Sequence, residues 1–355
     1  MRKKIYVYMT ALLAAVYLCA CSTGSAVSGD KVSAAGDTIS VVTTIFPEYE
    51  WVKSILGENP AGAELTMLLD NGVDLHSYQP TAEDILKIAD CDLFIYVGGE
   101  SDKWVANALH EAVNKDMIVI DLLDELGNAV KEEEIVEGME AGHDHDHEDG
   151  DGDDHDHEDG DDHDHEDGDD HDHEEGPEYD EHVWLSLKNA QTLCGSIEAA
   201  LEKIDNANAS VYKANLESYV SRLDALDKEY AAAVAAADKD TLLFADRFPF
   251  RYMTDDYGLK YYAAFSGCSA ESEASFDTVT FLAGKADELS LGHILIIESS
   301  DGKIAQTVAA NMSSGDVSIL TMNSLQSVTS KDVEEGISYI GVMQQNLEVL
   351  KEALQ

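Results

Sequence analysis

Between residues 209 and 237 the apolar side chains recur at intervals of three and four positions. This spacing predicts one amphipathic helix, because it lines the apolar residues along a single face. At 1.5 Å per residue the helix is roughly 40 Å long. Its apolar positions are Tyr212, Leu216, Tyr219, Leu223, Leu226, Tyr230 and Val234. A stiff helix of this length divides the chain into a part before it and a part after it.

Short apolar runs rich in β-forming residues alternate with helical patterns on both sides of this helix. This alternation predicts βαβ units and mostly parallel sheets. The predicted strands are residues 39–46, 64–70, 93–99, 117–123, 241–246, 259–265, 293–300 and 317–324. We therefore expect an α/β fold of two βα lobes joined by the long helix, with a ligand cleft between the lobes. Thr81 and Asp84 resemble a helix-capping pair, and residues 334–354 are predicted to close the chain as a helix.

The first 21 residues are typical of a bacterial signal peptide, with a basic start followed by a short apolar run. The run ends in "LCAC", which resembles a lipobox with Cys21 as the lipidated residue; an ordinary secretory signal is the alternative. We therefore expect a protein anchored by its lipid to the extracytoplasmic face of the cell membrane. The predicted divisions are the signal peptide 1–21, a tether 22–38, a first lobe 39–208 with a disordered loop 141–178, the linking helix 209–238 and a second lobe 239–355.

A tract at residues 143–175 holds nine histidines, 20 acidic residues and four glycines, with no apolar residue. Such a composition predicts a disordered segment that enters no core. The repeated His-x-His pairs favour capture of divalent metal over a role in solubility alone, because neutral imidazole is a common metal ligand. The histidines are His143, His145, His147, His155, His157, His163, His165, His171 and His173.

The formal net charge of the chain is −50. So acidic a chain makes nucleic acid an unsuitable partner and favours the attraction of cations. Three cysteines follow Cys21 in the chain, and this odd number argues against a disulfide framework.

Two of the four histidines outside the tract lie in loop-like, polar and aromatic surroundings. His76 occurs in "GVDLHSYQPT" and His182 in "DEHVWLSLKNA". His110 and His293, by contrast, lie within a predicted helix and at the start of a predicted strand, where structural roles are expected. His76 and His182 are therefore the candidate metal ligands of the first lobe.

These two stretches resemble the two histidine motifs of the zinc and manganese solute-binding lipoproteins of ABC importers. The acidic, His-rich insertion before the second motif, the long helix and the final helix are also similar to that family, over roughly residues 39 to 353. The resemblance implies a non-enzymatic, two-lobed protein that binds one divalent metal ion in the cleft. It also implies delivery of that ion to a membrane permease driven by an ATPase, and we expect the protein to be a monomer.

The sequence departs from the family at the ligands of the second lobe. The third ligand position falls on Arg247 or Ala245, and the fourth falls on Asn323. An arginine guanidinium stays protonated and has no acceptor atom, so it binds no cation. Three other residues remain open as ligands: Cys268, Asp246 and Glu298. Each also has a plain structural interpretation, as a small buried side chain, an ion-pair partner of an arginine and a capping group, respectively.

The nitrogen-rich candidate ligands and the tract favour Zn²⁺, with Mn²⁺ as the alternative. A surface metal buffer or adhesin without a permease is a second hypothesis. A metal-dependent hydrolase is a third, since two histidines and carboxylates suit a catalytic zinc. The chain contains no H-E-x-x-H motif, nucleophile elbow or phosphate-binding loop, which disfavours the enzyme.

Overall fold

The computed structural model describes residues 38–140, 178–269, 273–314 and 317–355. The predicted signal peptide with Cys21, the tether up to residue 37 and the whole His-rich tract lie outside the described residues. Among the helices that are described, none is both long and apolar enough to cross a membrane.

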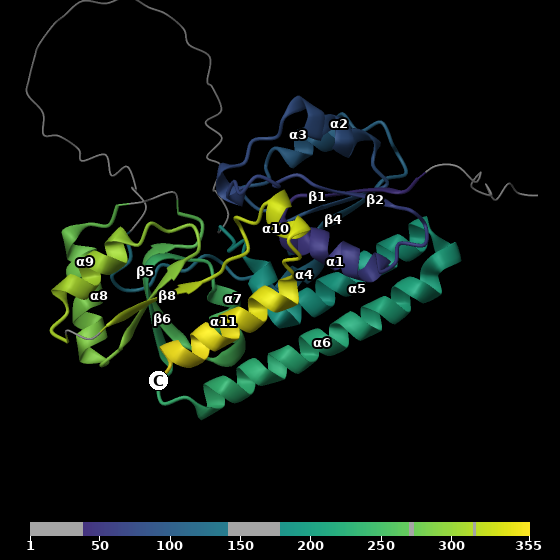
Figure 1. The fold of residues 1–355 in the computed structure, drawn as a ribbon. Coiled ribbons are helices and arrows are strands. Elements are labelled where there is room, and N and C mark those ends of the chain that lie inside the picture. The colour runs from purple at the N-terminus through teal and green to yellow at the C-terminus, as the bar shows by residue number, and fades with distance from the viewer. Residues whose placement is uncertain (1–37, 141–177, 270–272, 315–316) are drawn as a thin grey trace, which may run out of the picture. The chain divides into compact units, whose positions relative to one another are not determined.

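Four parallel strands form the first sheet, in the order β2-β1-β3-β4 (Figure 1). Their bounds are β1 (Ser40–Thr43), β2 (Glu64–Met67), β3 (Leu93–Tyr96) and β4 (Ile118–Asp121). The associated helices are α1 (Phe46–Leu56), α2 (Ala82–Asp90), α3 (Val105–His110) and α4 (Leu122–Leu126), with a 3-10 turn η2 (Gly127–Ala129). The predicted strands and their parallel pairing are confirmed, and so is the capping box of Thr81 and Asp84 at the start of α2.

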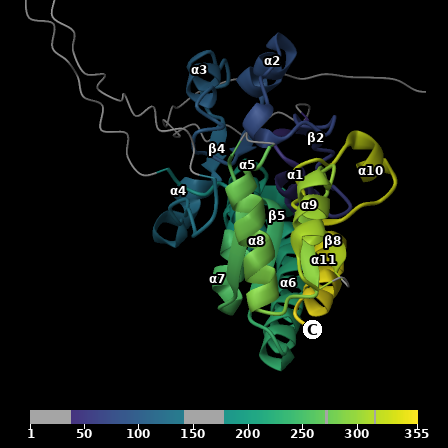
Figure 2. The ribbon, with the colours of Figure 1, turned by 90° about the vertical axis from the view of Figure 1, so that its left-hand side faces the viewer.

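The second sheet is also parallel, in the order β6-β5-β7-β8. Its strands are β5 (Thr241–Phe248), β6 (Lys260–Ser266), β7 (His293–Ile297) and β8 (Ser318–Met322), and its helices are α7 (Arg251–Tyr257), α8 (Phe276–Glu288) and α9 (Lys303–Asn311). The central strands β5 and β7 are largely buried on both faces, which explains their nearly continuous apolar sequences, whereas the edge strand β8 is mostly exposed. In β5, Leu243 and Ala245 pack with α8 and α9, whereas Leu242 and Phe244 belong to the core shared with the last helix, α11 (Tyr339–Ala353). Figure 2 shows α8 and α9 side by side on one face.

The predicted long helix is α6 (Ala209–Ala236), which joins the two lobes (Figure 1). It follows α5 (Leu187–Ile204) and a 3-10 turn η4 (Asn206–Asn208), and it packs against α5, α1 and α11. Five residues of its predicted apolar face are buried: Tyr212, Tyr219, Leu223, Leu226 and Tyr230. The fold class predicted from the sequence, two α/β lobes joined by a long helix, is therefore confirmed.

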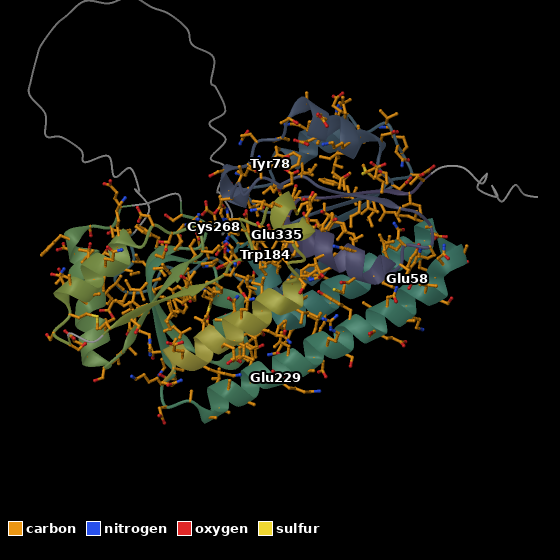
Figure 3. All side chains as sticks on the ribbon, viewed as in Figure 1. Glu58, Tyr78, Trp184, Glu229, Cys268 and Glu335 are labelled. Atoms are coloured by element: carbon orange, nitrogen blue, oxygen red, sulfur yellow. The ribbon has the colours of Figure 1, made fainter. Side chains whose placement is uncertain are left out.

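The predicted closing helix over 334–354 is present but begins later. It is α11 (Tyr339–Ala353), and the short helix α10 (Ser330–Glu334) precedes it. α11 begins after Ser338, because the Ser338 side chain accepts a hydrogen bond from the Gly341 N–H at 3.1 Å and caps the helix. The Tyr339 hydroxyl then donates to the Trp184 carbonyl at 2.6 Å and ties α11 to the segment that carries His182. Figure 3 shows Trp184 between the two lobes, with Cys268 close by.

Candidate metal centre

His76 lies in the 3-10 turn η1 (Leu75–Ser77), in the loop that follows β2. The Asp74 carboxylate caps this turn by accepting a hydrogen bond from the His76 N–H at 3.0 Å. The imidazole is largely buried, with 10% of the side chain exposed. The short, capped turn therefore fixes the backbone position from which the His76 side chain extends.

His182 precedes the 3-10 turn η3 (Val183–Leu185) and is completely buried. One carboxylate oxygen of Asp180 lies 2.9 Å from both the His182 backbone nitrogen and the ring Nδ1. Gly267 approaches this ring so closely that a Cβ there would lie 2.8 Å from His182 Cε1, which leaves room only for glycine. Asp180 thus holds Nδ1, and the other ring nitrogen, Nε2, remains free.

The two rings converge although 106 positions separate them in the sequence. His76 Nε2 lies 3.2 Å from His182 Nε2. Tetrahedral zinc, with Zn–N bonds of about 2.0–2.1 Å, holds two nitrogen ligands roughly 3.3 Å apart. Both Nδ1 atoms lie beside carboxylates, of Glu181 and Asp180 respectively, so the two Nε2 atoms are the ring nitrogens that face each other.

Cys268, in the loop after β6, is the third member of this cluster. The ligand atoms of His76, His182 and Cys268 all lie within 4.8 Å of one another. Burial raises the pKa of the Cys268 thiol well above its usual value, and the carboxylates of Asp180, Glu133 and Glu181 raise it further. The sulfur is therefore protonated without a cation, and a divalent ion must displace that proton to gain a thiolate ligand.

Gln326 is a fourth donor, and the sequence analysis missed it. In the amide orientation that satisfies its surroundings, the Gln326 nitrogen donates to the two carboxylate oxygens of Asp74 at 3.0 and 2.8 Å. The amide oxygen then accepts a hydrogen bond from His182 Nε2 at 2.7 Å. The side chain is 5% exposed and lies in the loop after β8. Its position just beyond the carboxyl end of a strand was the available signal, but the resemblance put the family's fourth ligand position on Asn323 in the same loop. The Asn323 side chain accepts a hydrogen bond from the Leu325 N–H at 2.8 Å.

The structure does not bring Asp246 and Glu298 into this cluster. The Asp246 carboxylate accepts hydrogen bonds from the backbone nitrogens of Arg247 at 2.8 Å and Ile297 at 3.3 Å. Glu298 accepts three hydrogen bonds, from Ser324 N–H at 2.7 Å, the Ser324 hydroxyl at 2.8 Å and the Ser327 hydroxyl at 3.0 Å. Glu298 therefore orders the loop that carries Gln326, and Asp246 connects β5 to β7.

Arg247 stands where the resemblance expects a ligand, and its guanidinium forms an ion pair with Asp74 instead. Its Nη2 lies 2.7 Å from Asp74 Oδ2. This pair joins the second lobe to the first, beside the cluster of His76, His182, Cys268 and Gln326. Burial acts to raise the pKa of Asp74, but Arg247 outweighs it and holds that pKa below its usual value. Asp74 is therefore a carboxylate at neutral pH and keeps accepting from the Gln326 amide.

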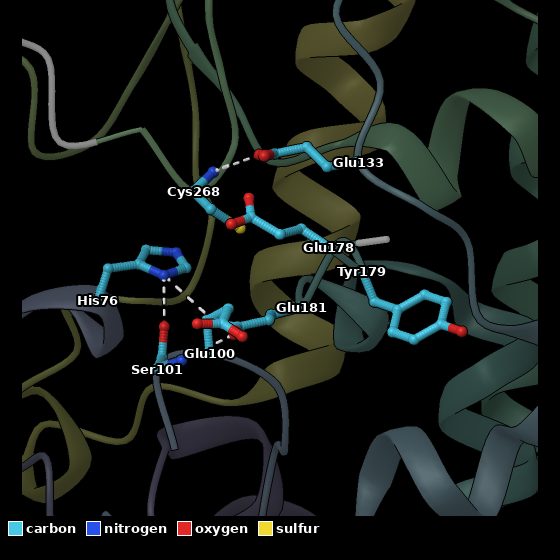
Figure 4. Close-up of a pocket in the computed structure, with 8 residues that line it drawn as sticks. All are labelled: His76, Glu100, Ser101, Glu133, Glu178, Tyr179, Glu181 and Cys268. Atoms are coloured by element: carbon cyan, nitrogen blue, oxygen red, sulfur yellow. Dashed lines mark hydrogen bonds and ion pairs between the residues drawn. The ribbon is translucent and has the colours of Figure 1, made fainter. Parts of the chain in front are cut away.

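A cavity of about 270 Å³ opens on this cluster (Figure 4). Its lining is rich in carboxylates and is formed by His76, Glu100, Ser101, Glu133, Glu178, Tyr179, Glu181 and Cys268. Carboxylates around a concave surface concentrate cations there. Glu178, one of the lining residues, comes three positions after the tract in the sequence.

The donor set suits zinc. Two imidazole nitrogens, one sulfur and one amide oxygen make four ligands, which is the number that zinc takes in its tetrahedral sites. Nitrogen and sulfur donors also disfavour Mn²⁺, which prefers oxygen ligands.

A model of the family described as zinc-uptake complex component A, periplasmic, matches residues 41–353. Zinc-binding protein AdcA of Streptococcus pyogenes is 30% identical over 313 residues, which cover 88% of this chain and 55% of that protein. The chain thus spans about half the length of that relative. The high-affinity zinc uptake system protein ZnuA of Bacillus subtilis is 29% identical over 343 residues, covering 97% of this chain and 96% of that protein.

Solved structures show the same fold. The Zn(II)-bound ZnuA-like domain of Streptococcus pneumoniae AdcA superposes with a TM-score of 0.65 at 25% identity, covering 90% of this chain and 99% of that one. The metal-dependent lipoprotein YcdH of Bacillus subtilis superposes with a TM-score of 0.67 at 26% identity, covering 89% and 99% of the two chains.

Proposed function

The chain belongs to the zinc-uptake complex component A family, and from that premise we propose that it captures a zinc ion in the cleft between its lobes. His76, His182, Cys268 and Gln326 are the proposed ligands. The observation that carries the proposal is the convergence of four donor atoms, two of them nitrogens 3.2 Å apart, beside a cavity lined by carboxylates.

The proposed ligands come from both lobes, so capture of the ion requires the two lobes to be close together. His76 belongs to a loop of the first sheet, whereas Cys268 and Gln326 follow strands of the second sheet. A bound ion therefore links the lobes, in parallel with the ion pair between Asp74 and Arg247. Because binding displaces the Cys268 proton, zinc uptake into the cleft releases a proton to solvent.

Delivery is the second part of the proposed function. The protein passes its zinc ion to an ABC permease, and an ATPase drives transport across the membrane. The lipobox-like "LCAC" at residues 18–21 supports attachment through lipid on Cys21, on the extracytoplasmic face. We propose that the protein acts there as a monomer and that it is a carrier, not an enzyme.

The His-rich tract at residues 143–175 serves, in this proposal, as a secondary collector. Zinc titration of the full chain should show one tight site together with several weak ones. Deleting residues 143–175 should remove the weak sites and slow capture when zinc is scarce, and it should leave the tight affinity within about twofold. The weak sites should also fade as pH falls through about 6.5, because protonated imidazole binds no metal.

A variant with asparagine at all nine tract histidines is the matched control, since it keeps the carboxylates of the tract. It should lose the weak sites as fully as the deletion does. The measurement is a competition titration against chelators of graded strength. Loss of the tight site on deletion would mean that the tract holds true ligands, and the proposed ligand set would then be wrong.

Gln326 provides a direct test of the fourth ligand. The variant Gln326→Leu fills similar volume but has no donor atom, so water must complete the zinc shell. We expect zinc affinity to fall about tenfold, which corresponds to about 1.4 kcal/mol. The exposed Gln344, changed to leucine in the same way, is the control and should leave affinity unchanged. Equal affinities of the two variants would remove Gln326 from the site.

A further inference from the structure

Glu181 is a buried carboxylate beside the ring of the proposed ligand His76. Its side chain is 1% exposed, although it lines the cavity that opens on the cluster. One oxygen, Oε2, lies 3.3 Å from His76 Nδ1, and the other, Oε1, accepts a hydrogen bond from the Ser101 N–H at 2.9 Å. Figure 4 shows Glu181 and Ser101 together at the side of the His76 ring.

Ser101 contacts both groups. Its hydroxyl oxygen is 2.7 Å from His76 Nδ1, and its backbone N–H holds the Glu181 carboxylate at 2.9 Å. The other carboxylate oxygen lies 3.3 Å from Nδ1. A carboxylate has no hydrogen to donate, so its negative charge at this distance favours the tautomer with hydrogen on Nδ1.

The His76 ring therefore carries its hydrogen on Nδ1, and Nε2 keeps its lone pair. A metal ion binds an imidazole only through a nitrogen without a hydrogen, and the partner of the other nitrogen decides which one that is. Nε2 is the atom that faces His182 at 3.2 Å. The carboxylate thus prepares the correct nitrogen of His76 before any ion arrives.

The local fold makes room for this carboxylate. Gly99 has a φ of +79°, and a Cβ at that position would overlap Glu181 Oε1.

We propose that Glu181 is a positioning residue for metal capture, which holds His76 in the tautomer with hydrogen on Nδ1, while the Ser101 N–H holds the carboxylate in place. This inference rests on the proposed function, because it concerns how one proposed ligand is prepared. Asp180 contacts Nδ1 of the other imidazole, His182, at 2.9 Å. The consecutive residues Asp180 and Glu181 thus orient the two imidazoles that face each other.

The variant Glu181→Gln tests the proposal, because glutamine has the same shape but carries an NH₂ group in place of one acceptor oxygen. If the oxygen of the introduced amide accepts from the Ser101 N–H, its NH₂ group faces His76 Nδ1 and favours the wrong tautomer. We expect zinc affinity to fall about tenfold, as is typical for loss of a partner of a metal-binding histidine. The matched control is Glu348→Gln, since Glu348 is 72% exposed and does not line the cavity, and affinity should stay within about twofold.

A spectroscopic measurement separates positioning from a merely structural role. In the zinc-free full chain labelled with ¹⁵N-histidine, NMR should show hydrogen on Nδ1 of His76 and none on Nε2. The His76 signals are those that vanish in His76→Gln. In Glu181→Gln the hydrogen should move to Nε2 for a substantial share of molecules, whereas Glu348→Gln should keep the wild-type pattern.

Two results would overturn the proposal, and the first is measured on the wild-type chain, so it does not depend on whether a variant folds. The wild-type chain could carry the His76 hydrogen on Nε2, or Glu181→Gln could keep both the wild-type tautomer and zinc affinity within twofold. Either result leaves the proposed function standing if the wild-type chain still binds zinc tightly. Failure of the wild-type chain to bind zinc tightly, with His76 in the expected tautomer, would instead contradict the proposed function.

Discussion

Replacing His182 by alanine should weaken zinc binding at the tight site by at least about 100-fold, or about 2.8 kcal/mol. His182 is completely buried, its Nδ1 is held by Asp180, and its Nε2 lies at the centre of the donors, 3.2 Å from His76 and 2.7 Å from Gln326. No other described side chain replaces it at that point. A competition titration with a strong zinc chelator measures the loss. The chelator removes zinc from the weak sites of the tract, so only the tight site contributes to the signal.

The control for this variant is His110→Ala, since His110 is 85% exposed and pairs only with its neighbour Glu111 among the described residues. It should bind zinc as the wild type does. Because His182 is also a packed core residue, thermal unfolding without metal must accompany the titration. A second variant, His182→Asn, retains a polar side chain and should lose zinc to a similar extent. Tight binding by a folded His182→Ala would exclude His182 as a ligand.

Cys268→Ser should reduce zinc affinity by about 100-fold, or about 2.8 kcal/mol, and should reduce manganese affinity much less. A thiolate is a soft ligand that zinc favours, whereas manganese gains little from it. The selectivity for zinc over manganese should therefore fall with the substitution. With Co²⁺ in place of zinc, the wild-type chain should show a sulfur-to-cobalt charge-transfer band, and Cys268→Ser should lack it.

Alkylation provides an independent measurement of the same contact. Among the described cysteines, Cys91 and Cys194 are buried and only Cys268 is partly exposed. Zinc should slow alkylation of Cys268 and leave the other two as slow as before, which makes them internal controls in peptide mass spectrometry. Equal labelling of Cys268 with and without zinc would remove it from the ligand set.

Arg247 occupies a position where the resemblance expects a metal ligand, and it forms an ion pair with Asp74 instead. A guanidinium there binds no cation, but it pairs with the carboxylate that orients the Gln326 amide. The side chain that replaces a ligand thus helps to direct another donor at the cleft. This relationship depends on a contact between the lobes, and so it is invisible in the order of residues.

Local patterns in the sequence determined the elements of this fold. Period-3.6 spacing identified α6, and alternating apolar runs identified all eight described strands, because such patterns depend only on neighbours along the chain. The sequence did not locate the start of the last helix correctly, because a single capping side chain decides it. Ser338 caps α11 inside the range 334–354 that was predicted as helix, four residues beyond the end of α10. The sequence also singled out His76 and His182, through short motifs whose residues lie close together.

The remaining donors were decided by tertiary structure alone. From the sequence, Cys268, Asp246 and Glu298 were all open candidates in the second lobe, since each lies near the carboxyl end of a strand. The fold directs the Asp246 and Glu298 carboxylates to hydrogen bonds that connect strands and loops, and it brings Cys268 to the histidines. Gln326 becomes a donor only because Asp74, 252 positions earlier, fixes its amide orientation. A metal site requires ligand atoms within a few ångströms of one another, and the packing of distant segments determines those distances. The spacing of residues along the sequence determines only the local backbone structure.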